Sequence, residues 1–238
     1  MSKPTYHNVH EHRFPDREAV ATALSGEIRT DLNEAIAVRD VASLIVSGGR
    51  TPQLFFSKLS QEPIKWDQVR VTLADERWVE PTSPDSNERF VRENLLQGAA
   101  QAAHFVGLKN PAPTPEAGID WAWRALSRVA RPYDVVVLGM GNDGHFASLF
   151  PGSLGLARGL DPQAKPACVA MNSLTAPHAR ISLNLAALLD SRRIVLHIEG
   201  EEKWAVWQRA RAGGSSTELP IRALLQQKTV PVDVYWAP

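Results

Sequence analysis

Short apolar runs that end in glycine or charged residues most constrain what this chain can fold into. They lie at residues 42–46, 69–73, 134–138, 194–198 and 232–236. Their shortness and β-branched content are typical of strands that are buried on both faces of a parallel sheet. Segments with helical periodicity separate them, and this alternation predicts a three-layer α/β/α fold around a mostly parallel, Rossmann-like sheet.

Other segments give weaker signals of helix or strand. Apolar residues recur at every fourth position from Val20 to Ile36, which predicts a long helix beginning near Asp16 as the first element. A helix is also expected at 53–60, with Thr51 as its cap and Pro52 at its first position. Further strands are expected at 104–108, 167–171 and 180–183, and further helices at 87–96, 121–129, 200–212 and 220–226.

Composition limits the class of protein and of partner. The chain has 238 residues, 44% of them hydrophobic, and shows no internal repeat, so we expect one α/β domain over residues 1–238. Lys plus Arg and Asp plus Glu number 26 each, so the overall charge gives no reason to expect nucleic acid or an anionic membrane as a partner. The sequence leaves open whether the protein is a monomer or a homodimer.

Cysteine usage and the first residues bear on location. Cys168 is the only cysteine, which excludes an internal disulfide and favours a reducing compartment. No Cys/His cluster has metal-ligand spacing, so no metal is expected. Residues 1–15 lack the apolar core of a signal peptide, and no apolar run approaches membrane-spanning length. We therefore expect a cytoplasmic location.

Several predicted strand ends carry residues suited to an anion. The segment 47–52, SGGRTP, offers backbone N–H groups, a hydroxyl and the positive end of a helix dipole, which suit a phosphate; the alternative is an ordinary capped turn. Arg77 can form a bidentate phosphate contact, and its alternative is a surface ion pair with Asp75 or Glu76. Lys203 lies in the first turn of a predicted helix, where the helix dipole favours acids. Since parallel strands end at one sheet edge, these groups are expected to converge.

The segment 138–152, LGMGNDGHFASLFPG, has the composition of a reactive loop. It follows a predicted buried strand and places Asp143 and His145 among glycines, at the edge where ligands bind in open α/β sheets. A histidine with a nearby carboxylate suits general base catalysis of hydrolysis. The alternatives are a histidine that caps a helix or lies at the surface, and a serine triad using Ser148, although no G-x-S-x-G elbow surrounds that serine.

Five motifs together resemble the 6-phosphogluconolactonase family. They are SGGRTP at 47–52, ADERWVEPTSPDSN at 74–87, LGMGNDGHFASLFPG at 138–152, RISLN at 180–184 and GEEK at 200–203. They come in that family's order and span most of the chain. The resemblance implies a glucosamine-6-phosphate deaminase-like fold and hydrolysis of 6-phospho-D-glucono-1,5-lactone to 6-phospho-D-gluconate in the oxidative pentose phosphate pathway, without a cofactor.

The resemblance also implies roles for individual residues. His145 would be the general base that activates water, and Asp143 would position His145 or the sugar. Asp75 and Asn87 would line the sugar pocket, and Arg50 receives no role. The residues that would bind the 6-phosphate are Gly48, Gly49, Thr51, Arg77, Arg180 and Lys203.

Two alternative functions stay open at this point. The related glucosamine-6-phosphate deaminase/isomerase has an equivalent GxDGH loop, but its loop continues with an Asn-Glu-Pro pattern, whereas here Ser148 to Gly152 contain no acid. A non-catalytic sugar-phosphate-sensing module would keep the pocket. No helix-turn-helix extension or basic segment is evident, and Asp143 and His145 are both present.

Overall fold

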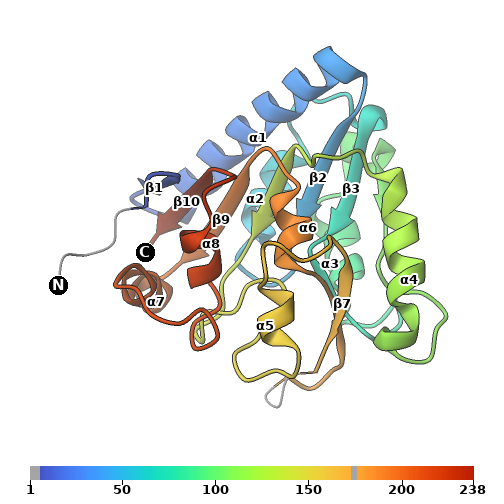
Figure 1. The fold of residues 1–238 in the computed structure, drawn as a ribbon. Helices are drawn as coiled ribbons and strands as arrows, with labels where there is room; N and C mark the ends of the chain where they lie inside the picture. Colours follow the sequence, from blue (N-terminus) through green and yellow to red (C-terminus); the bar gives the residue numbers. More distant parts are fainter. Residues whose placement is uncertain (1–5, 173–175) are drawn as a thin grey trace.

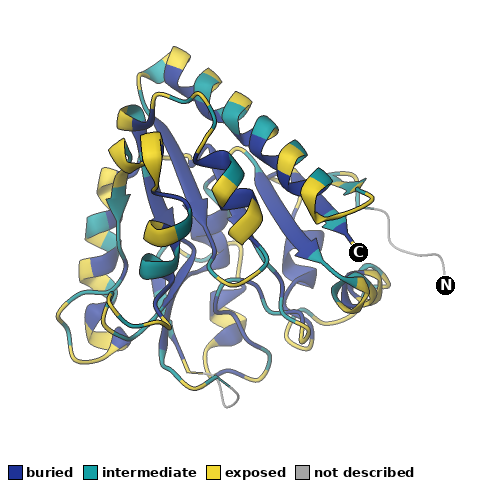
Figure 2. Cartoon of the chain, turned by 180° about the vertical axis from the view of Figure 1, so that it is seen from behind, coloured by how far each residue is buried: buried dark blue, intermediate teal, exposed yellow. Residues whose placement is uncertain are grey.

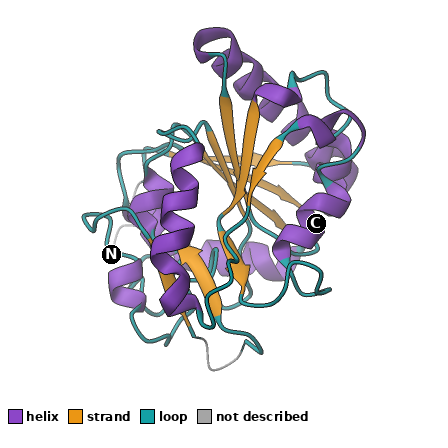
Figure 3. Ribbon diagram, turned by 90° about the vertical axis from the view of Figure 1, so that its right-hand side faces the viewer, coloured by secondary structure: helices purple, strands orange, loops and turns teal. Residues whose placement is uncertain are grey.

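A seven-stranded sheet forms the middle layer of the computed structural model, which describes residues 6–172 and 176–238 (Figure 1). Its order is β1-β10-β9-β6-β2-β3-β5, and every neighbouring pair is parallel. The strands are β1 Val9–Arg13, β2 Ala42–Val46, β3 Val69–Leu73, β5 His104–Val106, β6 Val135–Leu138, β9 Ile194–Glu199 and β10 Val232–Ala237. Figure 3 shows helices on both sides of these strands, so the predicted α/β/α architecture is confirmed.

Helices connect the strands and cover the sheet. They are α1 Arg17–Arg39, α2 Gln53–Leu59, α3 Asn87–Asn94, α4 Pro115–Ala125, α5 Leu156–Gly159, α6 Leu185–Leu189, α7 Glu201–Arg211 and α8 Arg222–Gln226. The predicted apolar stripe of α1 is buried, and Leu24, Ile28 and Leu32 have no exposed surface. Figure 2 shows the same pattern, with uniformly buried central strands and helices that are buried on one side. In the described part of the chain, no helix is both long and apolar enough to cross a membrane.

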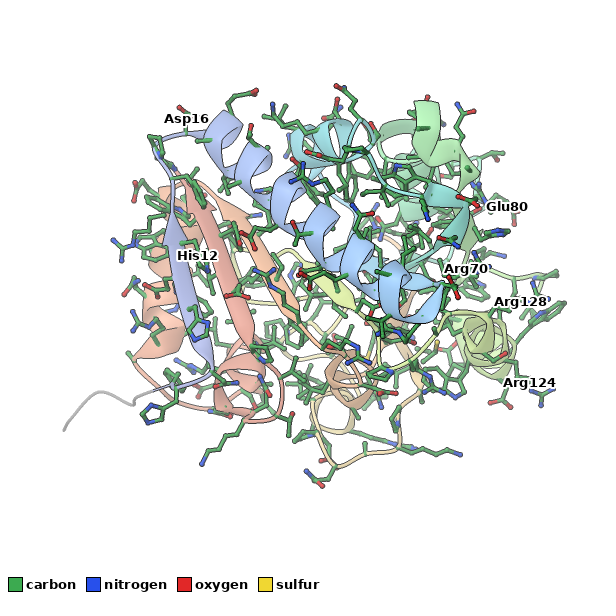
Figure 4. All side chains as sticks on the ribbon, turned by 90° about the horizontal axis from the view of Figure 1, so that it is seen from above. His12, Asp16, Arg70, Glu80, Arg124 and Arg128 are labelled. Carbon is green, nitrogen blue, oxygen red and sulfur yellow. The ribbon has the colours of Figure 1, made fainter. Side chains whose placement is uncertain are left out.

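The prediction that a long helix is the first element is wrong, because β1 precedes it. Helix α1 does begin as expected, since the side chain of Asp16 accepts a hydrogen bond of 2.8 Å from the backbone N–H of Ala19. Strand β1 pairs only with β10, at the edge of the sheet, and its residues are exposed or half-buried. An edge strand of this kind needs no apolar run. Figure 4 shows His12 on β1 and Asp16 at the start of α1.

A second, three-stranded sheet has the spatial strand order β4-β8-β7, with β4 Asp75–Arg77, β8 Arg180–Leu183 and β7 Cys168–Met171. Both of its pairings are antiparallel. The sequence predicts β7 and β8 but not β4, which is three residues long and charged. Because Arg77 pairs with Arg180 in this sheet, two of the predicted anion-binding residues are neighbours across the strands.

Two helix starts differ from the prediction. Helix α4 begins at Pro115 rather than near residue 121, because Thr114 caps it and a proline needs no N–H partner at the first position. Helix α2 begins after Pro52, but no side chain caps it, so the prediction of a Thr51 cap is wrong. The hydroxyl of Thr51 instead accepts a hydrogen bond of 3.3 Å from the ammonium of Lys203.

The direction of strand addition reverses between β2 and β6. The chain leaves β2 toward β3 and β5 on one side of the sheet, and it leaves β6 toward β9 and β10 on the other. The loops that follow these two strands therefore diverge and open a crevice at the carboxyl ends of the strands, where ligands bind in open α/β sheets. The segments 47–52 and 139–145 are these two loops.

Candidate active site

A cavity of about 320 Å³ lies between the loops that follow β2 and β6. Residues of β4 and β8 in the three-stranded sheet, of α3 and of the first turn of α7 complete its lining. Every residue predicted for the site lines the cavity except Asp143, which lies behind His145. These lining residues are Gly48, Gly49, Thr51, Asp75, Arg77, Asn87, His145, Arg180 and Lys203.

Cationic side chains dominate the charge of the cavity. Arg50, Arg77, Arg180 and Lys203 line it, against the single carboxylate of Asp75. Burial lowers the pKa of Lys203 and of Arg180, and nearby carboxylates oppose this effect in both cases. In the described residues, no group of three His, Cys, Asp or Glu side chains lies close enough to hold a metal ion. The lining is therefore suited to an anion.

Glycines in the 47–52 turn permit a close approach of α3. A Cβ on Gly48 would lie 2.0 Å from the Oδ1 of Asn87, a buried side chain. The Nδ2 of Asn87 donates a 2.9 Å hydrogen bond to the backbone oxygen of Asp75. Gly49 has a φ of +102°, which side chains rarely adopt. Gly48 therefore lets the turn lie against Asn87 at the start of α3, and Gly49 gives the turn its backbone conformation. Together they allow the turn, β4 and α3 to form one wall of the cavity.

Glu76 holds this wall through hydrogen bonds from backbone N–H groups, including that of Arg77 at 2.7 Å, and not through an ion pair with the Arg77 guanidinium. It is 1% exposed, and its carboxylate accepts hydrogen bonds of 2.8 and 2.7 Å from the backbone N–H groups of Asn87 and Glu88 at the start of α3. Burial raises the pKa of Glu76, and these N–H donors oppose the effect. The guanidinium of Arg77 donates to the backbone oxygen of Asp85 at 2.5 Å and forms no ion pair with an acid among the described residues, so the predicted alternative of a surface ion pair with Asp75 or Glu76 does not describe it.

His145 and Asp143 form a hydrogen-bonded pair. The Nδ1 of His145 lies 2.5 Å from the Oδ1 of Asp143, which also accepts a 3.2 Å bond from the backbone N–H of His145. Burial acts to raise the pKa of Asp143, but the hydrogen bonds and charge of His145 outweigh it and the pKa is lowered. Because an ionised carboxylate only accepts hydrogen bonds, this contact selects the neutral tautomer of the imidazole in which Nδ1 carries the proton and Nε2 has the lone pair.

The loop around this pair is held by one backbone hydrogen bond within the loop and by a second from Ile221, next to α8. The N–H of Gly141 donates to the oxygen of His145 at 2.9 Å, and the N–H of Ile221 donates to the oxygen of Gly144 at 2.8 Å. A Cβ on Gly141 would lie 2.2 Å from two atoms of the His145 ring. The observed position of the His145 imidazole therefore requires a glycine at residue 141.

Phe150 and Ser148, which follow His145 in the same segment, make contacts that the sequence did not predict. The ring of Phe150 packs on that of His145, with a centroid distance of 4.3 Å, and the guanidinium carbon of Arg180 lies 5.6 Å from the Phe150 ring. Ser148 is fully buried, and its hydroxyl donates to the Oδ2 of Asp75. The structure therefore gives no support to the alternative in which Ser148 is a nucleophile. An isolated phenylalanine or serine in a loop carries no sequence signal of such contacts.

Comparisons with known proteins show what the chain as a whole is similar to. The family model described as glucosamine-6-phosphate isomerases/6-phosphogluconolactonase matches residues 15–236. A 6-phosphogluconolactonase of Mesorhizobium japonicum is 47% identical over 225 residues, which cover 94% of each chain. One of Rhizobium meliloti is 44% identical over 227 residues, covering 95% of this chain and 98% of its own. The crystal structure of a 6-phosphogluconolactonase from Shewanella baltica has a TM-score of 0.94 at 48% identity, covering 99% of this chain and 100% of its own.

Proposed function

Because the chain belongs to the glucosamine-6-phosphate isomerase/6-phosphogluconolactonase family, we propose that its cavity binds 6-phospho-D-glucono-1,5-lactone and hydrolyses it to 6-phospho-D-gluconate. The names of its well-covered relatives support the assignment of the chain as a lactone-hydrolysing enzyme of the pentose phosphate pathway. The observation that carries the mechanism is the cavity itself, in which His145, hydrogen-bonded to Asp143, lies together with a group of cations.

The 6-phosphate is assigned to the cationic part of the cavity. Arg77 and Arg180 offer guanidinium groups, which match phosphate oxygens in pairs, and Lys203 adds an ammonium next to the hydroxyl of Thr51. The backbone of Gly48 and Gly49 lies at the same turn and adds N–H donors. Asp75 and Asn87 line the remaining wall and suit sugar hydroxyl groups. Fixing the phosphate in this way orients the lactone before the reaction, and orientation lowers the barrier.

His145 performs the proton transfers in this proposal. Its Nε2 takes a proton from water, and the water oxygen attacks the lactone carbonyl carbon to give a tetrahedral intermediate. When the bond between that carbon and the ring oxygen breaks, the same imidazole returns the proton to the ring oxygen, which becomes a hydroxyl. Asp143 holds the ring through Nδ1 and stabilises the imidazolium that forms between the two steps.

Replacing Lys203 by methionine tests the phosphate assignment. The change removes the ammonium but keeps an unbranched side chain, and we expect kcat/KM for the lactone to fall about tenfold, mainly through KM, because Arg77 and Arg180 remain. Burial already lowers the pKa of Lys203, so losing its charge should leave the Tm nearly unchanged. The matched control is Lys58→Met, which removes a surface ion pair with Glu18. An unchanged KM in the Lys203 variant would remove Lys203 from the phosphate site.

The activity itself is tested on the purified protein. Freshly prepared 6-phospho-D-glucono-1,5-lactone should be hydrolysed far faster than its spontaneous rate, as followed by acid release. Ammonia release from glucosamine 6-phosphate without lactone hydrolysis would favour the deaminase alternative instead. Binding of 6-phospho-D-gluconate without any turnover would favour the sensing module.

Four further predictions from the sequence are kept as part of the proposal. Residues 1–238 act as one domain, the location is cytoplasmic, no nucleic acid or membrane partner is needed, and the protein works as a monomer or a homodimer. The residues that line the proposed lactone site all come from one chain, which supports the single domain and the absence of a required partner.

A further inference from the structure

Arg222, at the start of α8, is a buried cation outside the cavity. It is 9% exposed and does not belong to the cavity lining. Its Nη1 donates a 3.0 Å hydrogen bond to the backbone oxygen of Ser215 and lies 3.4 Å from the Oε2 of Glu218. Both partners belong to residues 213–221, the connecting segment between α7 and α8. Burying a guanidinium costs free energy that such contacts offset, so Arg222 ties the connecting segment to α8.

The connecting segment passes directly against this guanidinium. A Cβ on Gly214 would lie 2.6 Å from the Nη1 and 2.7 Å from the Cζ of Arg222. Gly214 also has a φ of +117°, which side chains rarely adopt. The Nε2 of Gln226 donates a 3.1 Å hydrogen bond to the backbone oxygen of Gly214. Two side chains of α8 therefore hold the first part of the segment.

Hydrogen bonds link Arg222 to the last part of the segment as well. The oxygen of Ser215, which accepts the bond from Arg222, also accepts one of 3.3 Å from the backbone N–H of Leu219. The backbone N–H of Arg222 donates a 2.9 Å bond to the oxygen of Leu219. Arg222 therefore holds the buried Leu219 both directly and through Ser215.

Leu219 and Ile221 pack against the loop that carries His145. A Cβ on Gly144 would lie 2.4 Å from the Cδ1 of Leu219 and 3.7 Å from the Cγ2 of Ile221. The backbone N–H of Ile221 donates a 2.8 Å hydrogen bond to the oxygen of Gly144. Gly144 directly precedes His145, so a shift of Leu219 or Ile221 moves the backbone from which the imidazole extends.

We infer that Arg222 is a positioning residue for His145, because it fixes the connecting segment against which the backbone of Gly144 packs. This inference rests on the proposed function. Arg77 and Arg180, which are assigned to the phosphate, lie on β4 and β8 and not on this loop. Loss of the support should therefore displace the imidazole while the phosphate contacts remain. Because the rate depends on the position of the general base, the effect should appear in kcat and not in KM.

Two substitutions remove this support at different points. Arg222→Met removes the hydrogen bonds but keeps a long unbranched side chain, and Leu219→Ala removes the contact with Gly144. Arg222→Lys keeps a charged donor and should retain more of the rate than Arg222→Met. If Arg222 and Leu219 act along one route, the double variant should lose little more than either single variant.

Arg193 provides a matched control for general destabilisation. Its side chain is 17% exposed, and it donates to the Oδ2 atoms of Asp233 at 2.7 Å and of Asp31 at 2.8 Å. Arg193 directly precedes β9, at the opposite end of the strand from the cavity, and does not belong to the cavity lining. Arg193→Met should therefore lower the Tm without changing kcat.

The test measures kcat and KM for the lactone, the Tm, and the NMR signals of the His145 imidazole, which are assigned with His145→Ala. We expect kcat to fall roughly tenfold in Arg222→Met and in Leu219→Ala, with an unchanged KM and a shifted His145 signal. Arg193→Met should keep both the kcat and the signal of the unmodified protein. An unchanged kcat or an unchanged signal in Arg222→Met would overturn the inference, and so would an equal loss of kcat in Arg193→Met.

The same measurements separate this inference from the proposed function. If the unmodified protein did not hydrolyse the lactone, the proposed function would fail, whereas the His145 signal would still decide whether Arg222 positions the imidazole. If Arg222→Met did not fold, Arg222→Lys would carry the same comparison, with a smaller expected loss of kcat. Equal kcat values and His145 signals in Arg222→Lys, Leu219→Ala and the unmodified protein would then contradict the inference.

Discussion

Replacement of His145 by alanine is expected to lower the rate of enzyme-catalysed lactone hydrolysis by about 10²- to 10⁴-fold, the usual contribution of a positioned general base. The change removes the one imidazole among the described residues that line the cavity, and it leaves Asp143 without its hydrogen-bond partner His145. The cationic residues that are assigned to the phosphate stay in place, so the Kd for 6-phospho-D-gluconate should change little. Stopped-flow or pH-indicator assays corrected for spontaneous hydrolysis give the rate, and calorimetry gives the affinity.

The control for this variant is a second histidine–aspartate pair. The Nε2 of His12 lies 3.2 Å from the Oδ1 of Asp233, on the edge strand β1 and its neighbour β10 and outside the cavity lining. His12→Ala removes an imidazole from a carboxylate in the same way, and the lactonase rate should be retained. If His145→Ala kept the full rate, the base would have to be another group.

The second large effect is expected for Gly141→Ala, which adds one methyl group beneath the catalytic pair. The new Cβ would lie 2.2 Å from both Cε1 and Nδ1 of His145, and 2.7 Å from the Oδ1 of Asp143. Gly141 is not among the residues with positive φ, so the backbone accepts alanine and the conflict is steric. The ring must move by a large fraction of an ångström, and a displacement of about 1 Å can cost about 100-fold in rate.

Kinetics and stability together separate this displacement from misfolding. We expect kcat to fall about 100-fold in Gly141→Ala while the Kd for 6-phospho-D-gluconate stays within a few-fold. Gly26→Ala is the matched control, because a Cβ at this position in α1 has nothing within 4 Å. Alanine in mid-helix should raise the free energy of unfolding by about 0.5–1 kcal/mol without changing the rate. An undiminished kcat in Gly141→Ala would show that the imidazole position does not limit the reaction.

Sequence patterns predicted those parts of the fold in which burial is uniform. The strands that became β2, β3, β6 and β9 are buried on both faces, so their apolar content alone marks them. Strand β1 has one neighbour and partly exposed residues, and β4 is short and charged, so neither carries an apolar pattern. The sequence places the start of α4 near residue 121, whereas the helix begins at Pro115. A proline suits an extended segment as well as the first position of a helix, so Pro115 does not by itself mark a helix start.

The candidate site was predictable to the extent that its residues follow strand ends. Residues of the 47–52 turn, Arg77, His145 and Lys203 each follow a strand of the parallel sheet, and the parallel arrangement brings such ends to one edge. The supporting contacts depend instead on tertiary packing. Neither the buried Glu76 behind α3 nor the ring of Phe150 on His145 has a local pattern from which it can be read.

A crystal structure of the protein with 6-phospho-D-gluconate bound is the most direct measurement of the central claim that one cavity anchors the phosphate and presents the reacting carbon to His145. The account predicts the phosphate in contact with Arg77, Arg180 and Lys203, and the C1 carboxylate within hydrogen-bond distance of the Nε2 of His145. A ligand bound in the reverse direction, with its phosphate against His145, or bound outside this cavity, would contradict the account.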